Sequence, residues 1–278
     1  MCIIRTTFTH LGLNGHLNGD IHSVPKGMVK RGCVVFAHGY KGFKDWGAWG
    51  MMGDMFAEEG WEFVRFNFSH NGHVLPDLNQ CSDELAWGKN TYSKEKSDLE
   101  EIILNASESC KPNEKIIVIG HSRGGGIAAL AAANSHVDGV VLLASVSDFA
   151  RRFPMGDQLE AWRKTDRLEV VNGRTQQVLS HSFSFFEDFT MNADALNIES
   201  AVRSLKVPLL AVHGDSDQAV SDDEGRELAG WATQGQFVSI PDTGHTFGTS
   251  HPWTDESLPS PALKAMSHIV NFLNNVYR

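Results

Sequence analysis

The sequence predicts an α/β fold in which helices cover both faces of a mainly parallel β-sheet. Unbroken apolar and β-branched runs, such as residues 116–119, have the composition of strands that are buried on both faces. Segments with the apolar spacing of amphipathic helices, such as residues 48–59, alternate with these runs. The chain has 278 residues, 41% of them hydrophobic and 21% charged, which suits one α/β domain with a sizeable core.

The elements are predicted in the following order. Residues 3–24 contain short alternating segments separated by glycines, which indicate an antiparallel pair at a sheet edge. Further strands are predicted at residues 32–37, 61–68, 116–119, 139–144, 206–212 and 236–240. Helices are predicted at residues 48–59, 92–110, 127–133, 222–232 and 261–276.

Two segments depart from this alternation. Residues 69–91 are polar and contain Gly72 and Pro76, so they are predicted to form a long surface loop. Residues 147–204 mix charged and aromatic residues and show no clear strand. Because the strand pattern resumes after them, we interpret 147–204 as an insertion within a single domain that spans 1–278, rather than as a second core.

A nucleophile elbow is predicted where the 116–119 strand ends. Gly120-His121-Ser122-Arg123-Gly124 fits G-x-S-x-G, and helix-forming residues follow it. A sharp turn there would strain Ser122 and lift its hydroxyl above the sheet, while the two glycines would let strand and helix approach closely. The alternative, a glycine-rich turn with a capping serine, is less favoured because a strand precedes the motif and a helix follows it.

A nucleophilic serine needs a base, which we expect on a loop at the carboxyl end of a later strand. His245 follows the last predicted strand and has a glycine beside it, and it is our candidate for the base. His251, followed by a proline, is the alternative.

The base in turn needs an acid. Residues 213–220 offer Asp215 and Asp217 after the preceding strand, and the order Ser–Asp–His is the one expected for this topology. We prefer Asp217, since Asp215 lies at the strand end and suits a turn-forming role. Asp242 is interpreted as a turn residue of the His245 loop.

A tetrahedral intermediate would also need two N–H donors. The backbone of Arg123, directly after the serine, supplies one. The loop after the 32–37 strand, His38-Gly39-Tyr40, presents the N–H of Tyr40 as the second. We expect the His38 side chain to hold this loop through hydrogen bonds.

These motifs together resemble the α/β-hydrolase fold. They comprise the segments 34–40, 120–125, 213–220 and 243–245, and their order matches across residues 30–278. The nearest resemblance is to the branch with dienelactone-hydrolase-like proteins, feruloyl and cinnamoyl esterases and prolyl-oligopeptidase-like peptidases. In that branch the acid is the second Asp of H-G-x-x-D-x-x-V, which matches Asp217. The resemblance also implies that Ser122 is the nucleophile and that 147–204 is a cap over the site.

The function expected from these residues is carboxylic ester hydrolysis of a small-molecule substrate with short acyl or aryl groups, through an acyl-enzyme and without a metal or organic cofactor. The alternatives are a peptidase or amidase, a thioesterase or lipase-like hydrolase, and a non-catalytic ligand-binding protein on the same fold. Aromatic residues of the insertion, with Phe43 and Trp46, form either an apolar substrate pocket or a small core of the insertion.

The amino-acid composition limits the classes of partner that we expect this protein to bind. The formal charge of −10 argues against nucleic acid and against an anionic membrane surface. The four cysteines lack metal-ligand spacing, and the one at 33 is expected to be a buried thiol. With neither a signal-peptide pattern nor an apolar run of membrane-spanning length, we expect a soluble cytoplasmic protein. The oligomeric state is left open.

Overall fold

The computed structural model describes residues 3–74, 80–173 and 175–278. Within them, the main sheet has eight strands in the order β1-β2-β4-β3-β5-β6-β9-β10. Its strands are β1 (Ile4–Gly12), β2 (Gly15–Ser23), β3 (Gly32–Ala37), β4 (Trp61–Asn67), β5 (Lys115–His121), β6 (Gly139–Leu143), β9 (Leu209–Gly214) and β10 (Gly235–Ile240). The strands from β4 to β10 are parallel, whereas β2 pairs antiparallel with β1 and β4. The predicted parallel sheet with an antiparallel edge pair is confirmed.

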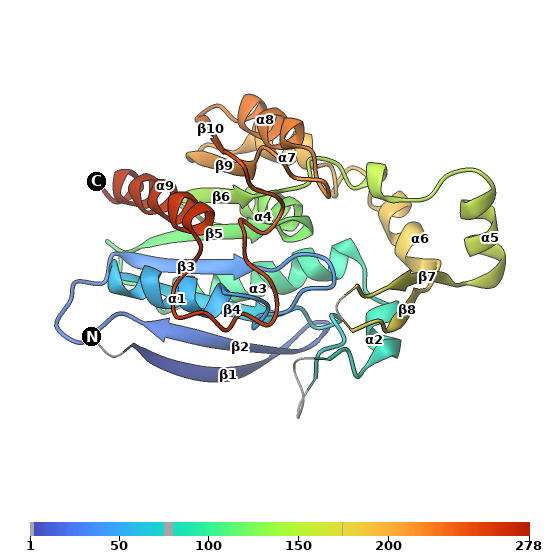
Figure 1. The fold of residues 1–278 in the computed structure, drawn as a ribbon, viewed down its shortest axis with the longest axis horizontal. Coiled ribbons are helices and arrows are strands. Elements are labelled where there is room, and N and C mark those ends of the chain that lie inside the picture. The colour runs from blue at the N-terminus through green and yellow to red at the C-terminus, as the bar shows by residue number, and fades with distance from the viewer. Residues whose placement is uncertain (1–2, 75–79, 174) are drawn as a thin grey trace.

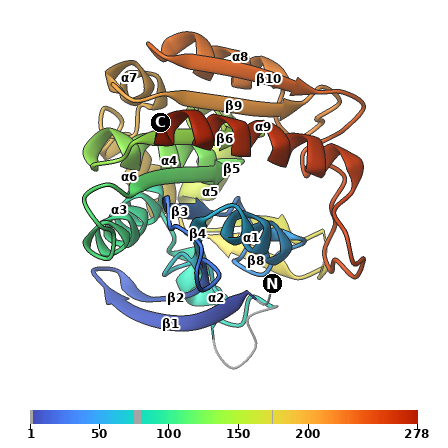
Figure 2. The same cartoon turned by 90° about the vertical axis from the view of Figure 1, so that its left-hand side faces the viewer.

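Helices cover both faces of this sheet (Figure 2). One face packs against α1 (Trp49–Glu58) and α9 (Ser260–Tyr277). The other packs against α3 (Tyr92–Glu108), α4 (Arg123–Asn134), α7 (Ile198–Ser204) and α8 (Asp222–Trp231). The predicted helices and strands are present, with ends shifted by a few residues.

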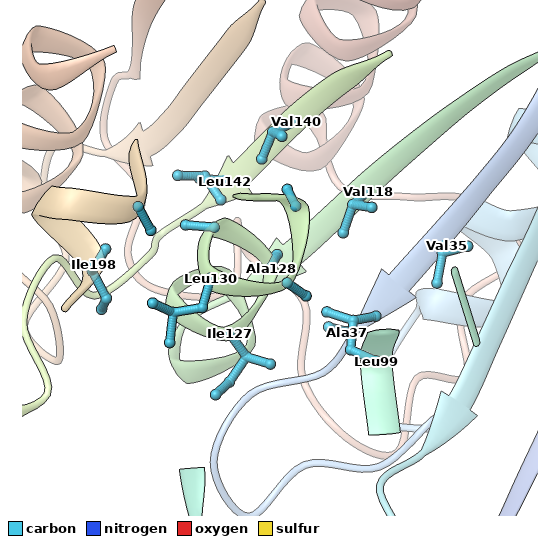
Figure 3. Close-up of a cluster of buried hydrophobic side chains, with 14 of the residues drawn as sticks. Val35, Ala37, Leu99, Val118, Ile127, Ala128, Leu130, Val140, Leu142 and Ile198 are labelled. Atoms are coloured by element: carbon cyan, nitrogen blue, oxygen red, sulfur yellow. The ribbon is translucent and has the colours of Figure 1, made fainter. Parts of the chain in front are cut away.

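Strand β3 shows why the central strands read as unbroken apolar runs. All of its residues are buried. Val35 and Ala37 join the cluster around α3 and α4, while Val34 and Phe36 join the cluster around α1 and α9. Figure 3 shows part of the first cluster, in which side chains of α4 lie between those of the central strands and those of neighbouring helices. Since successive side chains of a strand point to opposite faces, a strand covered on both sides needs apolar residues at every position.

The insertion lies beyond the carboxyl ends of the parallel strands (Figure 1). It contains the 3₁₀ turn η1 (Ala150–Arg152), α5 (Asp157–Thr165), β7 (Leu168–Val171), β8 (Val178–His181) and α6 (Ser184–Met191), and α7 ends it. The interpretation of 147–204 as free of strands is wrong, because β7 and β8 pair antiparallel. Each has only four residues and is partly exposed, so the alternation is too short to stand out in the sequence. Helix α7 packs against α4 and α8 of the main body.

The prediction of a surface loop at 69–91 is also wrong for much of the segment. A short helix, α2 (Glu84–Gly88), lies within it, and the Asp83 side chain accepts a hydrogen bond of 2.9 Å from the N–H of Ala86. Cys81 and Trp87 are buried. Pro76 lies outside the described residues. Five residues are too few to give a helical period, so only the capping aspartate signalled this helix.

Candidate active site

Ser122 lies at the junction of β5 and α4, on a sharp and strained turn. Its backbone has φ 57° and ψ −123°, a conformation that a residue with a side chain rarely adopts. A Cβ at Gly120 would collide with the carbonyl oxygen of Gly124, and a Cβ at Gly124 would collide with the carbonyl oxygens of Ala37 and His38. The predicted strain and the predicted reason for both glycines are therefore confirmed.

Asp217 and His245 meet at the same edge of the sheet. The Nδ1 atom of His245 lies 2.7 Å from Oδ2 of Asp217. A carboxylate only accepts hydrogen bonds, so Nδ1 carries the proton and Nε2 is left as the basic nitrogen. This is the tautomer that a general base beside a serine requires.

The Asp217 side chain is fully buried and accepts four hydrogen bonds. Oδ1 accepts from the N–H groups of Ala219 (2.8 Å) and Val220 (3.0 Å), and Oδ2 accepts from His245 and from Nε2 of His213 (3.2 Å). Burial alone would raise the pKa of this carboxyl, but the hydrogen bonds outweigh it and hold the pKa well below its usual range. His213, which sequence reasoning did not single out, thus orients the acid from the strand before it.

The other residues considered from the sequence, Asp215, Asp242 and His251, take no part in the Asp217–His245 pair. Asp215 accepts hydrogen bonds from the N–H of Asp242 (2.9 Å) and the hydroxyl of Ser216 (3.0 Å), which fits the predicted turn role. Asp242 itself has φ 56° in the turn. The Nδ1 atom of His251 accepts from the N–H of Gly47 at 2.9 Å, and the ring contacts aromatic side chains of the loop between β3 and α1.

Ser122 and His245 line the same two cavities. Within the described part of the chain, no hydrogen bond joins the serine hydroxyl to the imidazole. Such bonds are often long without substrate and shorten in the reacting complex. The arrangement therefore places the candidate nucleophile and the candidate base beside a common space.

The two N–H groups predicted as oxyanion donors are free to bind a ligand. Neither the N–H of Tyr40 nor that of Arg123 has an acceptor among residues 3–74, 80–173 and 175–278. A Cβ built on Gly39 would stand 3.0 Å from the Cβ of Ser122, so this loop approaches the serine closely. His38 donates from Nδ1 to the Gly39 carbonyl (2.9 Å). Burial lowers the pKa of His38 to about 3, so it stays neutral.

His121, the residue before the serine, supports the loop of His245. Its Nε2 donates to the carbonyl oxygen of His245 at 2.9 Å, and the two rings are 4.7 Å apart. Burial lowers the pKa of His121 to about 3, with His245 adding to the effect. A neutral His121 can thus hold the loop without placing a charge beside His245, the candidate base. The only signal in the sequence was its place in the motif.

Two cavities open beside Ser122. The smaller, about 220 Å³, is bordered by Trp46, Trp49 and Asn172. The larger, about 430 Å³, extends under the insertion, whose residues Phe153 and Phe185 form part of its wall. Phe43 is buried against His73 and lines neither cavity. Cavities of this size accommodate small organic groups.

Tyr40 connects the insertion to the main body. Its hydroxyl is 2.8 Å from Nε2 of His181 on β8, and its ring stacks with those of His181 and Trp87. The guanidinium of Arg123 lies over the same ring, 3.9 Å from its centroid. Burial lowers the pKa of His181 to about 3, with Arg123 contributing. Sequence reasoning missed His181 and Trp87, because only the tertiary fold brings their segments together.

In the residues described, no three His, Cys, Asp or Glu side chains lie close enough to hold a metal ion. None of the helices in those residues has both the length and the apolar character needed to cross a membrane.

Comparison with known proteins agrees with this architecture. A family model described as the alpha/beta hydrolase fold matches residues 32–203, more than half of the chain. The chain belongs to the α/β-hydrolase family. It is therefore an enzyme of the hydrolase kind, as the sequence motifs indicated. No significant match was found among the sequences of curated proteins.

Solved structures share the whole fold of this hydrolase at low sequence identity. Est1E from Butyrivibrio proteoclasticus with bound ferulic acid is 18% identical, covering 94% of this chain and 95% of that one with a TM-score of 0.71. A soluble variant of monoglyceride lipase from Saccharomyces cerevisiae, in complex with a substrate analogue, is 15% identical (99% and 97% covered, TM-score 0.73). DcsB with its substrate analogue is 13% identical (98% and 99% covered, TM-score 0.73). These likenesses concern the fold.

Proposed function

We propose that this α/β hydrolase is a serine esterase that cleaves carboxylic esters with short acyl or aryl groups through an acyl-enzyme. The observation that carries the proposal is the 2.7 Å contact between His245 and Asp217, at the sheet edge where Ser122 stands on a strained turn. Its support is geometric: the three residues come from three turns at one sheet edge, and Ser122 and His245 border a common space.

In the acylation step, Nε2 of His245 accepts the hydroxyl proton as the Ser122 oxygen attacks the ester carbonyl carbon. Asp217 stabilises the imidazolium that forms. The carbonyl oxygen becomes an oxyanion, which accepts hydrogen bonds from the N–H groups of Tyr40 and Arg123. The tetrahedral intermediate then collapses: the bond to the alcohol oxygen breaks, and His245 returns its proton to the leaving alcohol.

Deacylation repeats these steps with water as the nucleophile. His245 accepts a proton from the water as its oxygen attacks the acyl carbon, and the same two N–H groups hold the second oxyanion. Cleavage of the bond to Ser122 returns the proton to the serine and releases the carboxylic acid. The side chains present account for every proton, so this route calls for no cofactor.

The two cavities support a small-molecule substrate. We assign one to the acyl group and the other to the alcohol, since both border Ser122. The insertion is the proposed cap, because Phe153, Phe185 and neighbouring side chains wall the larger cavity. Among the structures with this fold, Est1E binds ferulic acid, and the lipase and DcsB hold substrate analogues.

The proposal is tested by labelling with a fluorophosphonate, which reacts with activated serines, followed by mass spectrometry of the modified peptide. We expect an adduct on Ser122 in the wild type and none in Ser122→Ala. Turnover of para-nitrophenyl butyrate is measured on the same preparations. A folded wild-type protein that neither forms the adduct nor hydrolyses the ester would contradict the proposal.

A further inference from the structure

The larger cavity has an uneven charge on its wall. Among the described residues that line it, three are cationic, namely Lys41, Arg123 and Arg152, and none is acidic. The remaining wall is mostly aromatic and aliphatic. In a protein with a formal charge of −10, a site beside the nucleophile that is bordered only by cations is unlike the rest of the chain.

Arg123 is the innermost of these cations. It is buried in the first turn of α4, directly after Ser122. Its guanidinium lies among aromatic rings, 3.9 Å from the centroid of Tyr40 and 5.1 Å from that of Tyr92. Among the described residues, the guanidinium makes one hydrogen bond, which Nη1 donates to Oε1 of Glu95 at 3.4 Å. A guanidinium has five N–H donors, so most of them have no partner among the described residues, and the residue lines the cavity.

The carboxylates nearby do not neutralise the wall completely. Glu95 and Glu224 stand behind Arg123 and Arg152, respectively, and pair with them. Lys41 instead donates to the carbonyl oxygen of Val171 at 3.2 Å. Each arginine thus has a carboxylate partner, whereas Lys41 has none among the described residues.

A second polar group opens on the same space. Tyr92 is 99% buried and lines the cavity, yet its hydroxyl has no hydrogen-bond partner in the part of the chain that the structure describes. The hydroxyl is not among the fully buried polar atoms that lack a partner, so it reaches the cavity, where a ligand acceptor could pair with it. Arg123 and Tyr92 together therefore favour a ligand group that accepts several hydrogen bonds.

We propose that the larger cavity binds the part of the ester substrate that ends in a carboxylate, with Arg123 as the residue that determines this specificity. The inference rests on the proposed ester hydrolysis and adds the class of substrate. The aromatic wall would contact the apolar body of that group, and the planar guanidinium would pair with its carboxylate.

Two pairs of esters test this preference, one for each side of the scissile bond. In the first pair the charge is on the acyl side: the para-nitrophenyl monoester of adipic acid against para-nitrophenyl adipamate. In the second it is on the alcohol side: para-carboxyphenyl butyrate against para-carbamoylphenyl butyrate. We expect kcat/KM to favour the carboxylate by about tenfold or more in one pair, the lower end for a hydrogen bond to a charged group.

Variants of Arg123 and Glu95 separate specificity from folding. Arg123→Met alone would leave Glu95 as a buried unpaired charge, so it is made together with Glu95→Gln. Glu95→Gln alone keeps the arginine and removes its competing carboxylate, and we expect it to retain or increase the preference. The double variant should bring the ratio close to one. Arg151→Gln is the matched control: Arg151 pairs with Glu227 and lines neither cavity, so the ratio should not change.

A binding measurement distinguishes failure of this inference from failure of the proposed function. Calorimetric titration of Ser122→Ala with the four uncleaved esters compares carboxylate and carboxamide without turnover. If the wild type hydrolyses neither these esters nor para-nitrophenyl butyrate and forms no fluorophosphonate adduct, ester hydrolysis is refuted, and the titration still decides the preference of the cavity. Equal binding of carboxylate and carboxamide, a neutral ester that is hydrolysed as well as its charged partner in both pairs, or a double variant that keeps the preference would each overturn the inference.

Discussion

Replacing Asp217 with asparagine tests the hydrogen-bond geometry of the candidate triad with almost no change in shape. Two backbone N–H groups point at Oδ1, so the amide oxygen of the asparagine would take that position. Its NH₂ group would then face Nδ1 of His245 and Nε2 of His213, where the carboxylate had accepted both protons. An NH₂ group only donates, so His245 must accept at Nδ1 and carry its proton on Nε2.

In that tautomer His245 cannot take the proton of Ser122. We therefore expect Asp217→Asn to lower kcat by about 10⁴-fold, the loss typical of a triad with the wrong tautomer. Nε2 of His213 keeps its other acceptor, the carbonyl oxygen of Val220 at 3.0 Å, so we expect only a small loss of stability. Asp215→Asn is the matched control, because its oxygen still accepts from the Asp242 N–H.

The assay is kcat on a neutral aryl ester, with urea unfolding to confirm that both variants fold. Nitrogen-15 NMR of the histidine side chains reports the tautomer of His245 directly. If Asp217→Asn kept activity within about tenfold of the wild type, or if Asp215→Asn lost more, Asp217 would not be the orienting acid and the tautomer reasoning would be refuted.

Three further predictions concern the serine, acid stability and the elbow. Ser122→Ala and His245→Ala should each abolish turnover and the double variant should cost little more, since the groups act as a unit; measurable kcat in His245→Ala would contradict this. The pKa of His121 is about 3 in the folded chain against about 6.5 when unfolded, so the unfolded state binds more protons between these values. The free energy of unfolding should therefore fall as pH decreases from about 6.5, with this histidine contributing about 1.4 kcal/mol per pH unit, and urea titrations should show a smaller slope in His121→Phe. Gly124→Ala should lower stability by about 1–3 kcal/mol through collision with the β3 carbonyls, whereas Gly230→Ala, on open surface of α8, should raise it by up to about 1 kcal/mol; calorimetric Tm values that rank them the other way would contradict the packing argument.

The sequence predicted the sheet and the elbow well because both depend on local patterns. A strand buried on both faces is apolar at every position, and 116–119 carries that signature in four consecutive residues. Gly120 and Gly124 are required by backbone contacts within the motif itself. Each of these features can therefore be predicted from a short segment of the sequence.

The features that sequence reasoning missed depend on contacts between distant segments. His213 and Asp217 are only four residues apart, but their hydrogen bond depends on how the chain leaves β9. The β7–β8 pair and α2 are too short for their periodicity to emerge. Arg123 was predicted only as a backbone donor, and the contacts of its side chain with Glu95 and the surrounding rings were not predicted. The one signal in the sequence was a charged residue, Arg123, at the start of a helix that otherwise begins with small and apolar residues.

The contacts of Tyr40 bear on how this scaffold is re-engineered. Tyr40, whose N–H is the proposed oxyanion donor, contacts His181 of the insertion and Trp87 of α2, so side chains from two peripheral segments position it. Grafting a foreign cap in place of residues 147–204 would exchange His181 and alter the donor together with the pocket. A cap graft that aims to change selectivity without loss of rate should therefore include a residue that packs against Tyr40 and Trp87 as His181 does. Tyr40, Trp87 and His181 would be exchanged together as one unit.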